Sequence, residues 1–252
     1  MGCSEDGQAI AEAAIVLPGM VFLLLAAVQL TQLQQARILA DSAAFAAART
    51  GIVMNGDPGK MRDAATFAIL PGVGPTDSFP AIARTLLRFK AEDAVLAPFG
   101  LAQLRVSVHS PAVSDFGAWG RHLNGQEIDF DDVRPGATDA TLLSLQIRYL
   151  YELKVPFANK LIQTLWMAAK AGVLEAWQGW DLTSPRFGGQ AGPDAIRISR
   201  AVAASGTAAQ APGGISVAAL AAAGRAGRYY LPVEAFYTMR MQSNPYRKWA
   251  RP

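Results

Sequence analysis

The chain has few of the residues that most often carry catalytic or metal-binding chemistry. Its 252 residues include one cysteine, Cys3, and two histidines, His109 and His122. A single cysteine excludes an intramolecular disulfide and a cysteine-rich metal site. The sequence also lacks the motifs of a serine hydrolase elbow, a phosphate-binding loop and a dinucleotide fold. We therefore expect no enzymatic activity and no bound cofactor or metal.

Charge is also sparse. Charged residues make up 17% of the chain, the net charge is +3, and Arg and Lys form no basic block. Nucleic-acid-binding domains concentrate positive charge on one surface, so we expect no nucleic-acid partner. Hydrophobic residues make up 51% of the chain. This composition is too polar for several membrane spans and fits a single span joined to a globular part.

The densest group of carboxylates lies in the middle of the chain, at Glu127, Asp129, Asp131 and Asp132. An EF-hand needs a different spacing and a glycine at its sixth position. Two interpretations stay open, a calcium site of another kind and a solvated strand face or loop. The sequence favours the second.

A long apolar run begins close to the amino terminus. Between Gly7 and Ala36 the one formally charged residue is Glu12. As a helix, residues 9–30 would span roughly 33 Å, which is enough to cross the hydrocarbon core of a bilayer. The segment is therefore predicted to be a transmembrane helix.

The helical pattern continues beyond the apolar run. Small and apolar residues recur every three or four positions after residue 30, with polar residues between them, and Gly51 is a suitable stop. We predict one helix over 8–51, membrane-buried in its first half and a water-facing stalk in its second. A cleaved secretory signal would need a basic start and a cleavage site after a short apolar core. Residues 1–7 contain no base, and the apolar core runs directly into the stalk.

Glu12 is unexpected at the start of an apolar helix. A carboxylate costs about 3 kcal/mol at the bilayer centre and less near an edge. From residue physics alone, Glu12 fits an interfacial position in the first turn, where an anion also suits the helix dipole. A second interpretation comes from the pattern Gly7-Gln8-Ala-Ile-Ala-Glu12 followed by the apolar run.

The segment GQAIAEAAIVLPGMVFLLLAAVQLTQLQQARILADSAAFAAARTG resembles the TadE-like pseudopilins of the tight-adherence (Flp, or Tad) pilus system. Its Gly–Glu spacing resembles the cleavage and assembly motif of type IV pilins. The resemblance implies that residues 1–7 are a leader, that a prepilin peptidase cuts after Gly7, and that Gln8 becomes the mature amino terminus. In pilins, a glutamate at the fifth mature position offsets the amino-terminal charge of a neighbouring subunit. By resemblance, Glu12 has this assembly role.

The sequence departs from the family at two points. Prepilin leaders are usually basic, whereas this leader contains Glu5 and Asp6 and no Lys or Arg. The positive-inside rule therefore does not support the orientation that the family implies. Ala13 follows Glu12 where major Flp pilins have tyrosine, which indicates a minor pseudopilin rather than the main filament subunit.

Residues 52–252 are predicted to form a small α+β domain. Alternating and helical patterns predict three strands and several helices, which favours an antiparallel sheet of three or more strands. The expected strands are 102–108, 138–155 and 228–242, and the expected helices are 60–70, 80–96 and 159–177. Residues 185–227, rich in Gly, Ala, Ser and Pro, are predicted to be a long loop.

Three tryptophans, Trp166, Trp177 and Trp180, fall on or just after the helix predicted at 159–177, with Phe157 before it. Such a stripe either packs in the core or forms an interfacial belt against a membrane. A core stripe is the more common of the two.

Together these features predict a minor pseudopilin, a structural component of a bacterial tight-adherence pilus. It would cross the inner membrane once, with its carboxyl-terminal domain in the periplasm or, after assembly, outside the cell. The implied partners are prepilin peptidase, other pilins and pseudopilins, the Tad assembly machinery and membrane lipid. The alternative is a signal-anchored periplasmic binding or scaffold protein outside any filament, with Met1 retained. The scarcity of histidine disfavours a membrane-tethered hydrolase.

Overall fold

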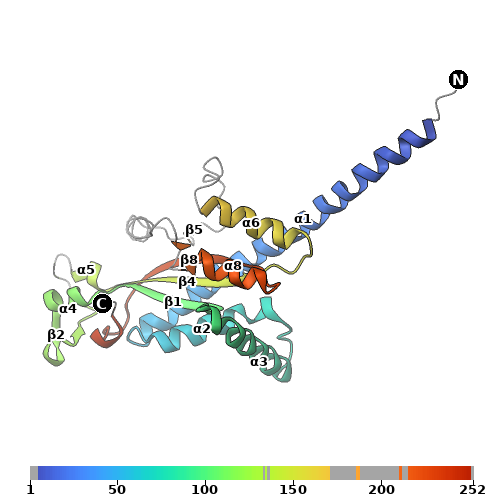
Figure 1. The fold of residues 1–252 in the computed structure, drawn as a ribbon. Coiled ribbons are helices and arrows are strands. Elements are labelled where there is room, and N and C mark those ends of the chain that lie inside the picture. Colours follow the sequence, from blue (N-terminus) through green and yellow to red (C-terminus); the bar gives the residue numbers. More distant parts are fainter. Residues whose placement is uncertain are drawn as a thin grey trace.

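The computed structural model describes residues 5–132, 134, 137–170, 186–187, 210–211 and 215–250. A long helix extends away from a body of helices packed on a sheet (Figure 1). This helix, α1 (Glu5–Val53), continues through Pro18. Its first part stands clear of the body and its second part lies along the sheet. The predicted long helix is confirmed, although it begins before residue 8 and ends after residue 51.

The body combines short helices with two long strands. Its α-helices are α2 (Pro58–Val73), α3 (Phe79–Leu96), α4 (Val113–Trp119), α5 (Ala137–Ala140), α6 (Ala158–Lys170) and α8 (Val217–Arg225), and its 3-10 turns are η1 (Ala97–Phe99), η2 (Leu123–Gly125) and η4 (Arg247–Trp249). The strands are β1 (Leu104–Ser110), β2 (Gly120–His122), β3 (Glu127–Ile128), β4 (Leu142–Glu152), β5 (Arg186–Phe187), β6 (Gln210–Ala211), β7 (Ile215–Ser216) and β8 (Tyr230–Arg240).

The main sheet has the order β1-β4-β8-β5. Strands β1, β4 and β8 are antiparallel neighbours, and Ile147 at the centre lies opposite Val106 on one side and Ala235 on the other. The short strand β5 adds to β8 in parallel. Two small two-stranded sheets, β2-β3 and β6-β7, complete the described strands. The predicted α+β fold with an antiparallel sheet is therefore confirmed.

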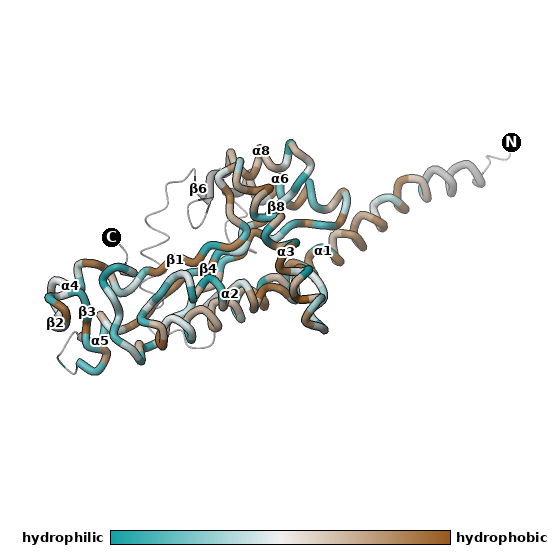
Figure 2. The backbone as a smooth tube through the Cα atoms, turned by 90° about the horizontal axis from the view of Figure 1, so that it is seen from below, coloured by the Kyte–Doolittle hydropathy of each residue, from teal (hydrophilic) through white to brown (hydrophobic). Residues whose placement is uncertain are grey.

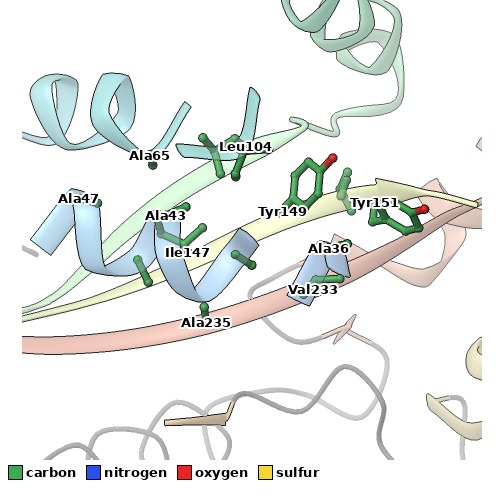
Figure 3. Close-up of a cluster of buried hydrophobic side chains, with 14 of the residues drawn as sticks. Ala36, Ala43, Ala47, Ala65, Leu104, Ile147, Tyr149, Tyr151, Val233 and Ala235 are labelled. Atoms are coloured by element: carbon green, nitrogen blue, oxygen red, sulfur yellow. The ribbon is translucent and has the colours of Figure 1, made fainter. Parts of the chain in front are cut away.

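The second part of α1 lies between α2 and one face of the sheet. A tight turn with left-handed backbone at Asn55 and Gly56 lets α2 fold back beside α1. Alanines fill the buried surface of α1, and Figure 3 shows Ala43 and Ala47 close to Ala65 of α2 and Ile147 of β4. Short side chains let backbones approach closely, so α1 contacts two layers at once. The alanines of α1 that become buried are Ala36, Ala40, Ala43, Ala44, Ala47 and Ala48.

The sequence predicts that α1 ends at Gly51, but it does not. The helix continues to Val53, and side chains of a neighbouring helix and strand pack directly against Gly51. A Cβ there would lie 2.5 Å from both Leu143 Cδ2 and Met61 Sδ. The glycine therefore serves packing rather than termination, a distinction that only the tertiary neighbours reveal.

One predicted helix end and one predicted loop are wrong in part. Helix α2 runs through Pro71 to Val73, beyond the expected end at residue 70, although Pro71 cannot donate a helical hydrogen bond at its own position. The loop predicted over 185–227 contains α8 at Val217–Arg225. Its run of alanines, the best helix formers, buries Leu220 and Ala223 in the core.

The close contact along α1 gives a test of the fold. Replacing Ala43 by Leu should lower the free energy of unfolding by about 1–3 kcal/mol, because the added methylene groups overpack a buried helix surface. Ser42→Leu, at the adjacent exposed position of α1, is the matched control and should have little effect. Chemical denaturation of the detergent-solubilised full chain measures both. Equal losses in the two variants would contradict this packing.

Candidate functional site

The outer part of α1 is the most unusual surface of the described protein. Every side chain from Glu12 to Val28 is at least partly exposed, including Ile15 and Leu23, and Figure 2 shows this stretch as mostly hydrophobic. By length and composition, α1 can cross a membrane. From Glu12 to Gln29 the helix rises about 26 Å, close to the roughly 30 Å of a hydrocarbon core. The exposed apolar surface therefore has the dimensions of a membrane anchor.

Gln29 marks the point where α1 enters the body. Its side chain is buried, and its Oε1 accepts a hydrogen bond of 2.8 Å from the backbone N–H of Val155, in the segment between β4 and α6. One turn further, Tyr151 Oη donates to Gln32 Oε1 at 3.3 Å. These bonds hold the end of β4 and the segment after it at the level where the apolar surface of α1 ends. We call this region the junction.

The predicted processing and assembly residues lie in the first turns of α1. Gly7 and Gln8 fall within its first four residues, whose N–H groups have no partner within the helix. Glu12 is exposed and one turn beyond Gln8, on the same side of the helix. The geometry is compatible with a carboxylate near a new amino terminus. The roles of Gly7, Gln8 and Glu12 stay predictions.

The acidic cluster takes part in local contacts. Asp132 forms an ion pair with Arg134, Asp129 Oδ1 accepts from the N–H of Asp131 at 3.1 Å, and Glu127 Oε2 accepts from Asn244 Nδ2 at 3.4 Å. Within the described part of the chain, no group of three or more His, Cys, Asp and Glu side chains could hold a metal ion. The carboxylates thus organise the segment around β3.

The polar side chains of β4 are buried, a feature that alternation alone did not predict. Strand β4 turns Ile147 toward α1 (Figure 3), so Gln146 and Arg148 face the opposite side of the sheet. On that side His109 Nε2 lies 3.0 Å from Gln146 Oε1, and Arg148 lies opposite Glu234 of β8. Arg148 is only 5% exposed. This row of polar side chains is an internal part of the body.

Burial has an electrostatic consequence for Arg148. Loss of solvation lowers the pKa of its guanidinium to about 10, and the positive charge of Arg105 acts in the same direction, whereas Glu234 raises it. Arg148 is still protonated at neutral pH. The structure therefore holds a charge in its interior, and the opposed carboxylate of Glu234 offsets part of the cost.

A groove of about 470 Å³ lies near the junction, lined by α1, the end of α2 and the end of β4. Apolar residues such as Leu39 line it, together with Gln32, Tyr151 and Lys154. A catalytic site needs a nucleophile or base held by an orienting partner, and the lining residues contain no such pair. The groove has the character of a packing surface.

The tryptophan stripe divides between described and undescribed residues. Trp166 is buried on α6 and belongs to the main core, so the core interpretation holds for it. Trp177 and Trp180 lie outside the described residues. Phe157, which precedes α6, is instead strongly exposed.

Comparison with known proteins bears on the amino-terminal segment. Residues 7–49 match the model of a family described as TadE-like protein. The match confirms the resemblance seen in the sequence and covers the exposed apolar surface together with most of the packed part of α1. This family implies association with the Tad pilus machinery. No curated protein and no solved structure matches the chain.

The junction can be tested through Gln29. Gln29→Leu leaves the N–H of Val155 buried without its acceptor and should destabilise the body by about 1–3 kcal/mol. Gln34→Leu, at an exposed position of the same helix, is the control. Hydrogen exchange of the Val155 amide should accelerate in the first variant alone. Unchanged protection of that amide would show that this hydrogen bond does not hold the junction.

The buried charges can be tested by a double-mutant cycle. Glu234→Leu removes the carboxylate opposite Arg148 and should cost about 3 kcal/mol of stability, because the buried guanidinium loses an opposite charge. Adding Arg148→Met should recover most of the loss. The free energy of unfolding of both single variants and the double variant measures the coupling. Additive losses would contradict a favourable interaction between the two side chains.

Proposed function

We propose that this chain, a TadE-like protein over residues 7–49, is a minor pseudopilin, a structural component of a tight-adherence pilus rather than an enzyme. The observation that carries the proposal is the division of α1. The family match covers a helix that is apolar and exposed from Glu12 to Val28 and packed into a folded body from Gln29 onward. A subunit that is first held in a membrane and then packed by its helix into an assembly needs these two halves.

Processing by a prepilin peptidase fits the position of Gly7. The Gly7–Gln8 bond lies in the first turn of α1, where backbone N–H groups lack helical partners. Glycine also lowers local helix stability by about 1 kcal/mol relative to alanine. The first turn is therefore the easiest part of α1 to unwind for a peptidase.

Glu12 fits an assembly role after this cleavage. The carboxylate would lie one helical turn from the new amino group of Gln8 and could pair with the amine of a neighbouring subunit. Between apolar helices, such a pair is screened less than in water. The exposed side chains of Ile15, Leu17 and Leu23 would be buried against neighbouring helices at the same time, which compensates for leaving the lipid.

The proposed topology places the body on one side of the membrane. With α1 as a single span in the inner membrane, the segment before Glu12 faces the cytoplasm and the body faces the periplasm. The partners are then the prepilin peptidase at the cytoplasmic end, lipid along the apolar surface, and other pilins and the Tad machinery during assembly.

Glu12→Ala separates processing from assembly. We expect the variant to be cleaved after Gly7, since the bond itself is unchanged, but to reach the sheared pilus fraction at least roughly tenfold less, because a buried amine loses its partner. Glu12→Asp, which keeps the charge, is the control and should retain more assembly. Mass spectrometry of the mature amino terminus and quantification of sheared pili provide the two measurements.

The same experiment distinguishes the alternatives. A mature chain that still begins at Met1 would favour a signal-anchored periplasmic binding or scaffold protein. Normal assembly of Glu12→Ala would remove the proposed role of that carboxylate. Neighbouring genes for a pilus ATPase and a prepilin peptidase would support the pseudopilin class independently.

A further inference from the structure

We propose that the start of α6 rests on the surface of the lipid bilayer and fixes the height of the body above it. The surface consists of Phe157 and Leu161, which would enter the boundary between headgroups and acyl chains, and of Lys154 and Lys160, which would bind lipid phosphates. We call these four residues the α6 patch. The inference rests on the proposed membrane anchoring of α1.

The junction sets the level of the α6 patch. Gln29 directly follows the exposed apolar stretch of α1, and its side chain holds the backbone of Val155 at 2.8 Å. Phe157 is two residues further along the chain and therefore within about 7 Å of that backbone. A bilayer that surrounds α1 up to Val28 would thus reach the α6 patch.

The position of the Phe157 side chain does not contribute to the packing of the body. Its side chain is 78% exposed, and its backbone has φ 64°, in the left-handed region that a bulky residue rarely adopts. Local hydrogen bonds from Ala158 N to Pro156 O and from Asn159 N to Val155 O, at 2.8 and 3.0 Å, hold this turn. A large aromatic ring is therefore kept in a strained turn and in contact with solvent. A lipid surface would give that ring a favourable environment.

The first turns of α6 separate into a core side and an outer side. Gln163 is buried and its Nε2 bonds the carbonyls of Leu220 and Tyr230, and Trp166 joins the core. On the outer side Leu161 is 44% exposed, and its backbone N–H donates to the carbonyl oxygen of Phe157 at 3.5 Å. The two large apolar side chains of the α6 patch are therefore both exposed, within one turn of chain at the helix start.

The charges around the α6 patch favour an anionic surface. Lys154 and Lys160 are both exposed, and long lysine side chains can lie along apolar groups while their ammonium groups reach phosphates. The nearby carboxylate of Glu152 is already paired with Arg228 at 2.9 Å. Exposed aromatic and aliphatic side chains flanked by lysines are typical of segments that bind the membrane interface.

Depth-dependent fluorescence quenching tests this contact in the full chain. A Cys3→Ser background removes the native thiol, and Phe157→Cys carries an environment-sensitive fluorophore. The matched control is Phe79→Cys, because Phe79 is 84% exposed at the start of α3, which packs on α2. The chain is reconstituted into vesicles of equal parts phosphatidylcholine and phosphatidylglycerol that contain nitroxide-labelled lipid. The label at residue 157 should be quenched about twofold or more relative to residue 79.

A second comparison tests the lysines. Lys154→Gln combined with Lys160→Gln should reduce quenching at residue 157 in the vesicles that contain phosphatidylglycerol, and should change it little in vesicles of phosphatidylcholine alone. Loss of quenching to the same extent in both lipids would contradict the proposed binding of anionic headgroups.

The outcomes separate this inference from the proposed function. A chain released from the vesicles by alkaline extraction would overturn membrane anchoring and the α6 patch together. A chain that is retained, with residues 157 and 79 quenched equally, would overturn the contact of the α6 patch alone. Crosslinking between copies at residue 157 without lipid quenching would assign the surface to a second copy of the chain and also overturn the inference.

Discussion

The contact between the alanine surface of α1 and the sheet is the constraint on which the rest of the structure depends. The alanines of α1 leave too little volume for a thick side-chain layer, so the helix lies close to β4 and β8 on one side and to α2 on the other (Figure 3). Because α1 continues without a break from this contact to the exposed apolar stretch, the body and the membrane-type segment share one helix. The orientation of that helix in a membrane therefore also orients the body.

The two faces of the sheet bury different kinds of side chain. The face toward α1 is mostly apolar and includes Ile147, Tyr149 and Tyr151, whereas the opposite face buries Ser144, Gln146 and Arg148. Buried polar groups cost stability unless they have partners, and Ser144 Oγ lies 3.0 Å from Thr238 Oγ1 while Arg148 lies opposite Glu234. Such partners favour one register of β4 against β8, because a shift would separate them. The polar face thus favours one strand register, and the apolar face contributes most of the buried apolar surface.

The junction links this body to the proposed assembly role. Gln29 is the first fully buried polar residue after the apolar stretch, and it uses its side chain to hold the segment before α6. An apolar residue at this position would extend the membrane-type surface into the body without giving the Val155 N–H an acceptor. The amide therefore marks the boundary between the part of α1 that would face lipid or other helices under the proposed function and the part that packs into the body.

The sequence by itself determined the long helix, its apolar first half, the TadE-like resemblance, and the strands later seen as β1, β4 and β8, because these depend on local periodicity and on a short contiguous motif. Tertiary structure alone decided that Gly51 continues the helix, that β4 is buried on both faces, and that Phe157 is exposed while Trp166 is in the core. The alanine-rich α8 was missed because its composition resembles that of a loop. Only the tertiary structure shows that Leu220 packs in the core. For Gly51, the buried β4 and α8, the deciding contacts join residues far apart in the chain, which local patterns cannot encode.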